Sequence, residues 1–260
     1  MERPTPIERI GLPPGDEFVA RYVRKSRPVI LAGAARDWPA LKSWMPDELA
    51  RRFSDRVVPV LRTRSDGGFY NAEGGMNYDR MSMGEYVDAL HARRRELYMV
   101  FHIQEALPEL LEDVHVPELC RRAAWFWPRF WFGMGGTGGP LHADLPHNLY
   151  MQAVGRKQFT LVHYHQTARV YPFPPWSGIP NFSQVDAEEP DLDRFPRFAR
   201  ATRQVAELEP GDMLYIPSLY WHQPRALTDS VSINLWWANG ALREVVRAAE
   251  WFMRKRQLKL

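Results

Sequence analysis

The amino-acid sequence predicts a mainly β protein with flanking helices, in which the β part forms a sandwich or barrel. From about Phe130 onward, short apolar runs recur between turns that contain Gly, Pro, Asp and Asn. Strands at such spacing are typical of sandwiches and barrels, whereas the chain before Phe130 mixes helical and strand patterns. The apolar runs cover residues 130–134, 148–154, 158–164, 213–216 and 231–237.

The N-terminal elements are expected to support this β part. Apolar residues recur at helical spacing over residues 15–25 and 83–94, and residues 46–53 carry a proline in the first turn of a helical pattern. Residues 28–33 and 57–61 are short apolar runs that indicate buried strands. Residues 1–125 therefore read as a set of helices and strands that buttress the core.

Two further segments are set apart by composition, besides a glycine-rich loop at residues 66–75. Residues 171–200 are rich in proline, and a loop of that length inside a compact domain is usually functional. Residues 241–256 show the pattern of an amphipathic helix, which would cover the sheet or form a homodimer contact. We predict one domain over residues 1–260, made of the buttress at 1–125, a β core at 126–240 and a C-terminal helix at 241–260.

The composition is globular and excludes several classes of protein. Hydrophobic residues make up 45% and charged residues 25%, and the net charge of +3 is small beside 34 basic and 31 acidic side chains. This balance predicts a mixed surface with no nucleic-acid footprint. The single cysteine, Cys120, excludes an internal disulfide and a multi-cysteine zinc site. Neither a signal peptide nor a membrane span is recognisable, so we expect a cytoplasmic protein.

The first chemical motif is Pro140-Leu141-His142-Ala143-Asp144. On an extended strand, residues i and i+2 point to the same face, so His142 and Asp144 would project side by side. An imidazole and a carboxylate presented in this way are two ligands for a divalent metal. The pair alone is weak, because His-x-Asp occurs often by chance.

A third ligand candidate lies downstream. Pro210-Gly211-Asp212 makes a tight turn, residues 213–216 form a buried strand, and His222 follows beside two bulky aromatic residues. Two histidines and one carboxylate on one face of a metal leave the opposite face open. This arrangement suits non-haem Fe(II), whose open positions take a bidentate co-substrate and O2. Zinc hydrolysis would need a nearby general base, and none is evident, although zinc, nickel or manganese could occupy a purified sample.

A lysine after the next turn completes the pattern. Gly155 marks a turn after the strand that leads away from the first two ligands, and Lys157 begins the following strand. A buried ammonium needs an anionic partner, and a co-substrate carboxylate would supply one. The alternative is an exposed lysine next to a hairpin turn.

Taken together, these motifs resemble the JmjC, or cupin-like, 2-oxoglutarate oxygenases. The resemblance extends over residues 27–240 and is densest over residues 131–237. Within the family it is most similar to the branch that contains the asparaginyl hydroxylase acting on hypoxia-inducible factor. The motifs that carry it are Arg27-Pro28-Val29-Ile30-Leu31, Asp37-Trp38-Pro39, His142-Ala143-Asp144, Gly155-Arg156-Lys157, Ser183-Gln184-Val185-Asp186, and Pro210-Gly211-Asp212 leading to His222.

The resemblance implies a double-stranded β-helix of the jelly-roll, or cupin, kind as the core. It implies that the core at residues 126–240 binds Fe(II) through His142, Asp144 and His222. The implied reaction uses O2 and converts 2-oxoglutarate to succinate and CO2 while a C–H bond of the substrate is hydroxylated.

The resemblance also implies where the co-substrate 2-oxoglutarate would lie. Its near end would chelate the iron and its far carboxylate would pair with Lys157. Tyr98 matches a tyrosine that binds the same carboxylate. Asn148 and Asn234 match asparagines near the metal-chelating end.

The chain departs from the family pattern at two places. Where relatives often have Thr or Ser three residues before the first ligand, it has Gly139, so that contact would fall to Thr137 or to a water. Where the asparaginyl hydroxylase has Arg and Gln to hold its target, it has Asn181 and Phe182. The amide clamp is therefore missing, and Phe182 favours a more apolar target.

Other residues receive weaker interpretations. His163 and His165 are expected on a polar strand face, without an obvious third ligand. His147 lies close to the proposed ligands in sequence and reads equally as a substrate contact or a surface residue. Trp236 and Trp237 are expected in the core and in the wall of the site.

Three functions remain open from the sequence. The leading hypothesis is a dioxygenase that hydroxylates a side chain of a protein or peptide, because the long segment at residues 171–200 could lie over an extended chain. The second is a hydroxylase of a free small molecule or natural-product intermediate. The third is a non-enzymatic cupin, which predicts loss of a ligand or of the lysine, and neither is lost. Methyl-lysine demethylation ranks lower because no chromatin-reader module is recognisable.

Overall fold

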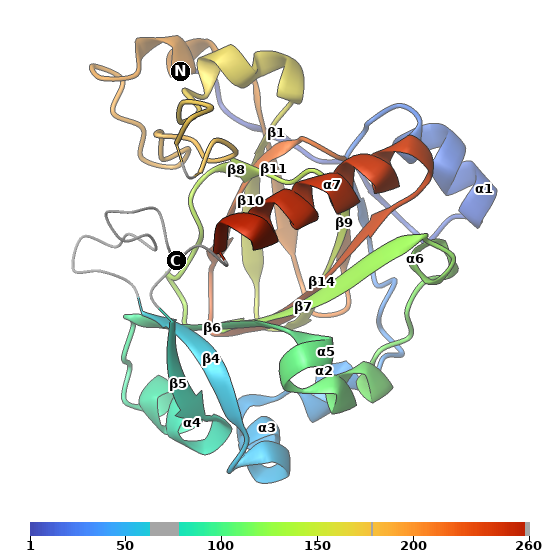
Figure 1. Ribbon diagram of the computed structural model, residues 1–260, viewed down its shortest axis with the longest axis vertical. Coiled ribbons are helices and arrows are strands. Elements are labelled where there is room, and N and C mark those ends of the chain that lie inside the picture. The colour runs from blue at the N-terminus through green and yellow to red at the C-terminus, as the bar shows by residue number, and fades with distance from the viewer. Residues whose placement is uncertain (63–77, 178, 258–260) are drawn as a thin grey trace.

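The computed structural model describes residues 1–62, 78–177 and 179–257, and its strands form two sheets (Figure 1). The larger sheet has nine strands in the order β2-β3-β12-β9-β14-β7-β6-β4-β5, and the smaller has five in the order β1-β11-β10-β13-β8. Their bounds are Thr5–Pro6 (β1), Arg9–Ile10 (β2), Val29–Leu31 (β3), Val57–Arg62 (β4), Tyr78–Ser82 (β5), Leu97–His102 (β6), Trp125–Gly133 (β7), His142–Ala143 (β8), His147–Val154 (β9), Lys157–Val162 (β10), Arg203–Leu208 (β11), Met213–Ile216 (β12), Trp221–Ala226 (β13) and Ser230–Ala238 (β14).

Strands β7 to β14 form the double-stranded β-helix that the family resemblance implied. Four of them, β7, β9, β12 and β14, are neighbours in the larger sheet, and the other four, β8, β10, β11 and β13, are neighbours in the smaller one. All pairs among these eight strands are antiparallel. The predicted mainly β fold with a jelly-roll core is therefore confirmed.

The larger sheet has two chemically different faces, because side chains alternate along each strand. On β9, Leu149 and Met151 point outward into the largest hydrophobic cluster, while Asn148 and Tyr150 point inward toward the smaller sheet. On β14, Asn234 is paired with Tyr150 and so shares the inward face. The outward face stabilises the fold, and the inward face carries the polar groups.

The N-terminal helices cover the outward face of the larger sheet (Figure 1). The predicted helix at residues 15–25 is divided into α1 and a π-helical turn at Val19–Val23, whereas the helix at residues 46–53 has the expected bounds. The helix bounds are Gly15–Phe18 (α1), Ala40–Ser43 (α2), Pro46–Phe53 (α3), Met83–His91 (α4), Ile103–Ala106 (α5), Glu118–Arg121 (α6) and Gly240–Gln257 (α7), with 3-10 turns at Pro108–Asp113, Tyr164–Arg169 and Pro196–Arg200.

The strands β6, β11 and β13 were not predicted as separate elements. Pro224 lies within β13, and a proline inside a short run argues against a strand when only the sequence is read. The structure accommodates it because the carbonyl of Pro224 accepts from Gly139 N while β10 pairs along the other edge. His222 consequently belongs to a strand and does not lie in the loop after β12.

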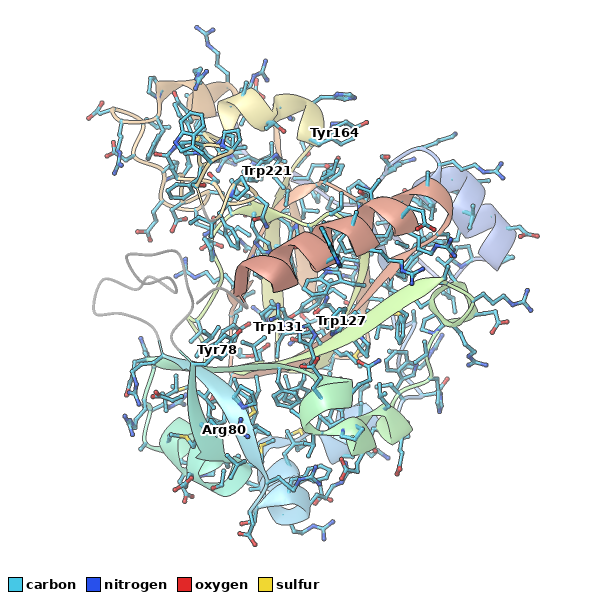
Figure 2. The ribbon with its side chains drawn as sticks, viewed as in Figure 1. Tyr78, Arg80, Trp127, Trp131, Tyr164 and Trp221 are labelled. Atoms are coloured by element: carbon cyan, nitrogen blue, oxygen red, sulfur yellow. The ribbon has the colours of Figure 1, made fainter. Side chains whose placement is uncertain are left out.

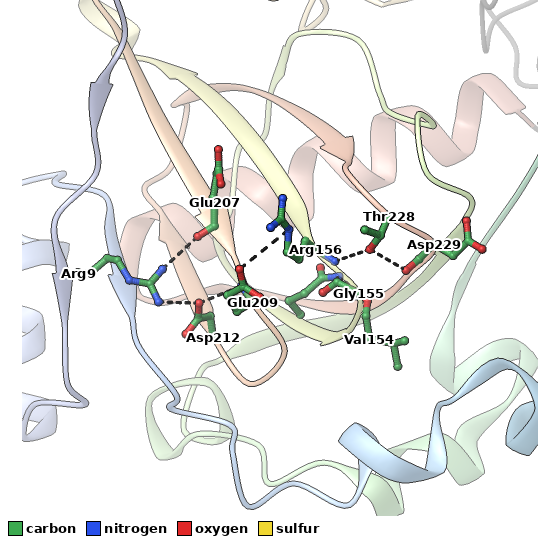
Figure 3. A network of polar contacts seen from close by, with 10 residues as sticks. Arg9, Val154, Gly155, Arg156, Glu207, Glu209, Asp212, Thr228 and Asp229 are labelled. Atoms are coloured by element: carbon green, nitrogen blue, oxygen red, sulfur yellow. Dashed lines mark hydrogen bonds and ion pairs between the residues drawn. The ribbon is translucent and has the colours of Figure 1, made fainter.

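One turn network anchors the hairpin ends at the side of the core where Lys157 begins β10 (Figure 3). Asp212 accepts hydrogen bonds from Arg9, from Gly33 N at 2.9 Å and from Glu209 N at 3.0 Å. Gly155 has φ of +69°, and a Cβ there would lie 1.9 Å from the carbonyl oxygen of Asp229. Only glycine fits this turn, so the turn fixes where β10 starts.

Several expectations outside the core need correction or stay open. His163 and His165 do not lie on a strand: β10 ends at Val162, and His163 begins the 3-10 turn Tyr164–Arg169 by accepting from His165 N. The glycine-rich loop at residues 66–75 lies outside the described residues. In α7, Val246 is buried and Trp251 is exposed, and the homodimer contact stays a prediction. None of the helices in the described part of the chain has the length and apolarity needed to cross a membrane.

Candidate metal centre

The three proposed ligands lie together on the inner face of the smaller sheet. His142 on β8 and His222 on β13 are direct cross-strand partners, and Asp144 follows β8 by one residue. The Nε2 atoms of His142 and His222 lie 4.0 and 3.6 Å from the Asp144 carboxylate oxygens. Their candidate ligand atoms all lie within 4.8 Å of one another. The sequence spacing predicted that His142 and Asp144 lie side by side, and the pairing of β8 with β13 brings His222 to them.

Backbone carbonyls orient both imidazoles in the same way. His142 Nδ1 lies 2.8 Å from the carbonyl oxygen of Pro140, and His222 Nδ1 lies 2.9 Å from that of Tyr220. Because a carbonyl only accepts, each Nδ1 carries the proton and each Nε2 presents a lone pair to the centre. Burial, reinforced by the neighbouring His142, lowers the pKa of His222 to about 4. The two carbonyl contacts thus direct the Nε2 atoms of both rings toward the centre.

Asp144 is held by a residue that the sequence analysis placed only in the wall of the site. The indole Nε1 of Trp236, on β14, donates to Asp144 Oδ2 at 3.0 Å, and the backbone carbonyl of Asp144 accepts from Leu219 N at 2.7 Å. The hydrogen bond from Trp236 ties the larger sheet to the ligand set on the smaller one. The sequence signal was available, because Trp236 follows Asn234 by two positions on the same strand face.

The donor set fits a catalytic metal with open positions. Two imidazole nitrogens and one carboxylate lie on one side, and the described residues contribute no fourth His, Cys, Asp or Glu to the group. A two-histidine, one-carboxylate set is typical of non-haem Fe(II), whereas structural zinc is closed by four protein ligands. The side chains of His142 and Asp144 keep 17% and 15% of their surface exposed, so the group is accessible from solvent.

Lys157 crosses the space between the two sheets. Its side chain is buried, with only 1% of the residue exposed, and Nζ lies 2.8 Å from the Tyr150 hydroxyl on β9. Tyr98 Oη and Ser232 Oγ lie farther away, at 3.5 and 3.4 Å. Burial lowers the pKa of Lys157 to about 7. No carboxylate contacts this ammonium among the described residues, so it lacks the counter-ion that a buried charge requires.

Lys157 and the ligand group lie on the same inner face, two side-chain rows apart. Lys157 is paired with Ala226 and Leu161 with His222 on neighbouring strands. The two pairs are four positions apart along each strand, which corresponds to roughly 13 Å. Apolar Phe159 and the ring of Pro224 form the row between them.

The three other predicted co-substrate residues reach this region as well. Tyr98 on β6 lies next to Lys157, and Asn148 and Asn234 face inward from β9 and β14. The amide oxygen Oδ1 of Asn148 and the amide nitrogen Nδ2 of Asn234 are buried and have no hydrogen-bond partner among the described residues. Unsatisfied polar atoms in this position fit a polar ligand that would bond to them.

The residues at which the chain departs from the family pattern make contacts around the ligand group and the turn before it. The Thr137 hydroxyl donates to the carbonyl of Met134 at 2.6 Å. Asn181 binds the backbone of Ala143 from both its carbonyl and its side-chain amide, and so braces the strand that carries His142. The Phe182 ring stacks on His142 at 5.3 Å between centroids. The residues that replace the amide clamp therefore support and shield the ligand group.

His147 is not part of the group, although it is near in sequence. Its Nδ1 accepts from the Tyr215 hydroxyl at 3.0 Å and from Ser218 N at 3.2 Å, and its ring packs on Trp237. Burial lowers its pKa to about 4. His147 faces the outward side of the sheet because it differs from Asn148 by one position, and it is partly buried. Its interpretation as a substrate contact stays a prediction.

Residues that the sequence analysis did not name complete the inner face. Tyr150 and Ser232 contact Lys157, and Trp131 donates its indole N–H to Asn234 Oδ1. Polar residues at alternate positions of an apolar strand, such as Ser232 and Asn234, are the signal that could have found them. Tyr150 could not be distinguished from a core aromatic residue.

The chain matches the model of the cupin-like domain family over residues 14–241. It belongs to that family, as the sequence resemblance indicated.

Several named proteins are similar in sequence to the chain. The chain is 35% identical to "Lysine-specific demethylase 8" of Xenopus tropicalis over 92% of its own length and 54% of that protein. It is 32% identical to the protein of the same name in Danio rerio, over 89% of the chain and 58% of that protein. It is 25% identical to the human "Bifunctional peptidase and (3S)-lysyl hydroxylase JMJD7", over 90% and 84%. The chain thus spans little more than half the length of the first two relatives. The nearer resemblance to the asparaginyl hydroxylase branch stays a prediction.

Proposed function

We propose that the protein is an Fe(II)- and 2-oxoglutarate-dependent dioxygenase that hydroxylates a side chain of a protein or peptide and releases succinate and CO2. His142, Asp144 and His222 would hold Fe(II) on one face. When bound, the metal and 2-oxoglutarate supply the oxidative chemistry with O2. The chain's own residues bind and orient both and limit the access of water.

The observation that carries the proposal is the placement of Lys157. A buried ammonium with only hydroxyl neighbours, about two side-chain rows from the ligand group, suits the far carboxylate of a short dicarboxylic acid. Tyr98 and Tyr150 would share that carboxylate through their hydroxyl groups. Asn148 and Asn234 would satisfy their unpaired amide atoms near the other end.

A polypeptide substrate is supported by the surroundings of the ligand group and by the relatives. Phe182, which stacks on His142, belongs to the long segment at residues 171–200, so this segment borders the reacting centre. The same segment presents Trp176 with 85% of its surface exposed. Two of the relatives are named as a lysine-specific demethylase and a lysyl hydroxylase. A lysine-containing peptide is therefore the first probe to use.

The first test is succinate formation from 2-oxoglutarate under air, with Fe(II) and ascorbate. We expect iron-dependent succinate in the unmodified protein and none in His142→Ala. His165→Ala is the matched control, because His165 is an exposed histidine outside the ligand group. Absence of both succinate and 2-oxoglutarate binding in the iron-loaded protein would refute the proposal in favour of a non-enzymatic cupin.

The second test distinguishes the kinds of substrate by mass. Peptides with unmodified lysine should gain about 16 Da, which is one oxygen. A loss of about 14 Da per methyl group from methyl-lysine peptides, with formaldehyde, would indicate demethylation instead. Turnover of small molecules without any peptide product would replace the polypeptide substrate with a free metabolite.

A further inference from the structure

Arg129 is a cation on the inner face that the chemistry described so far does not use. It lies on β7, where it is paired with Asn234 of β14 on one side and with His102 of β6 on the other. This register places it in the same row as Tyr150. Trp127 and Trp131, which precede and follow it by two positions on β7, are labelled in Figure 2.

The Arg129 guanidinium lies over two indole rings. Its Cζ lies 5.3 Å from the ring centroid of Trp131 and 5.5 Å from that of Trp236. Both indoles are themselves fixed, because Trp131 donates to Asn234 and Trp236 donates to Asp144. The Trp236 side chain therefore contacts both the guanidinium and the carboxylate of the ligand group. Such a planar cation, held in place by aromatic faces, is already oriented for an incoming anion.

Arg129 has no anionic partner among the described residues. Every ion pair found in that part of the chain joins other side chains, and Nε of Arg129 is buried without a hydrogen bond. The residue as a whole is only partly buried, so the guanidinium is not sealed in the core. A partly buried arginine without an acid is costly unless a ligand provides one.

Charge counting identifies where that acid must come from. In the proposed complex, Fe(II) with Asp144 carries one positive charge and protonated Lys157 carries another, and the two carboxylates of 2-oxoglutarate balance both. The two imidazoles are neutral. Arg129 then leaves one uncompensated positive charge on the inner face. The co-substrate has no carboxylate left for it, so the remaining partner is the primary substrate.

We propose that Arg129 is a specificity-determining residue that pairs with a carboxylate of the primary substrate, in the form of an acidic side chain near the hydroxylated residue. The inference rests on the proposed function for its substrate but concerns binding, so it can be measured without turnover. The planar guanidinium, which lies over the rings of Trp131 and Trp236, would take the carboxylate in a bidentate pair.

The experiment uses protein loaded with Zn(II) and 2-oxoglutarate, so that no turnover occurs, and an array of paired seven-residue peptides. Each pair has a central lysine flanked by Asp or Glu in one member and by Asn or Gln in the other. We expect the acidic member of the best-bound pairs to bind about tenfold more tightly or better. Arg129→Met should remove this preference. Arg129→Lys should retain part of it, because lysine keeps the positive charge but cannot form the bidentate pair. Arg80→Met, at an exposed arginine on β5 (Figure 2), is the matched control and should keep it.

A second arm identifies the source of the carboxylate. N-acetylglutamate and N-acetylglutamine are titrated in the same way, and a preference for the acid as strong as that in peptides would overturn the assignment to a polypeptide side chain. Equal binding of both members of every peptide pair, or an acidic preference that survives Arg129→Met in protein that still binds 2-oxoglutarate, would overturn the role of Arg129. So would a loss of 2-oxoglutarate affinity in Arg129→Met without any change in peptide preference. If the protein prefers acidic peptides but forms no succinate, the proposed reaction is refuted and the role of Arg129 in binding stands.

Discussion

The indole N–H of Trp236 donates a 3.0 Å hydrogen bond to Oδ2 of Asp144, across the gap between the two sheets of the core. This contact connects the larger sheet, which lies on the N-terminal helices, to the ligand group on the smaller sheet. It also leaves Asp144 Oδ1 for a metal.

Trp236→Phe should lower the affinity for Fe(II), or for Co(II) as its spectroscopic substitute, by about 10- to 100-fold, because the carboxylate loses the donor that orients it. Isothermal titration calorimetry of the metal-free protein measures the change. Trp237→Phe is the control: its indole nitrogen has no hydrogen-bond partner and its ring packs on the opposite face of the same strand. An equal loss of affinity in both variants would contradict the role given to the Trp236 N–H.

Lys157→Met should abolish detectable 2-oxoglutarate binding while stabilising the ligand-free protein. Replacing a buried, unpaired ammonium by an apolar side chain of similar length is expected to raise the free energy of unfolding by about 1–4 kcal/mol. Urea denaturation at pH 7 and calorimetric titration with 2-oxoglutarate measure the two effects. Lys42→Met, on the exposed surface of α2, should change neither. A destabilised Lys157→Met protein would show that Lys157 is a structural residue.

The affinity for 2-oxoglutarate should fall as the pH rises through 7. Only the protonated form of Lys157 pairs with a carboxylate, and burial lowers its pKa to about 7, so the charged fraction declines above that pH. The dissociation constant should then rise by about tenfold for each pH unit above 7. Burial raises the pKa of Tyr98 and Tyr150, the ionisable groups that face the ammonium from β6 and β9, so they stay neutral.

The control for this pH dependence is Lys157→Arg. A guanidinium stays protonated over the whole range, so any affinity that the variant retains should not change between pH 6 and 9. A wild-type profile that is flat between pH 7 and 9 would contradict a lysine pKa near 7.

Gly155→Ala should destabilise the protein by about 3 kcal/mol or more, because the added Cβ would meet the Asp229 carbonyl oxygen at 1.9 Å in a left-handed backbone conformation. The turn would have to shift, and Lys157 with it, so 2-oxoglutarate binding should weaken as well. Thermal unfolding followed by circular dichroism measures the loss. Gly136→Ala is a matched comparison, since Gly136 has φ of +89° but nothing within 4 Å of its Cβ. Gly136→Ala should destabilise the protein clearly less than Gly155→Ala. An equal destabilisation in the two variants would show that the positive φ alone, and not the clash with the Asp229 carbonyl, causes the loss.

Some elements could be predicted because their signal is local. Residues 46–53 form α3 as expected, since a proline in the first turn and the spacing of apolar residues specify a helix without reference to the rest of the chain. The strands β12 and β14 likewise follow from apolar runs between turns. By contrast, β13 was not predicted because it contains Pro224. Whether a strand can contain a proline depends on which neighbouring strand pairs with it at that position.

For the candidate site, the sequence by itself determined which residue types are available and which of them share a strand face. His142 and Asp144 lie two positions apart, and Gly155 before Lys157 marks a turn, so their local geometry follows from the chain. Only the tertiary structure decided that His222 is the cross-strand partner of His142 and that Lys157 is buried against Tyr150. Strand register across two sheets depends on packing between distant segments. The same dependence explains why the contacts of Arg129 with the rings of Trp131 and Trp236 could not be foreseen from the sequence.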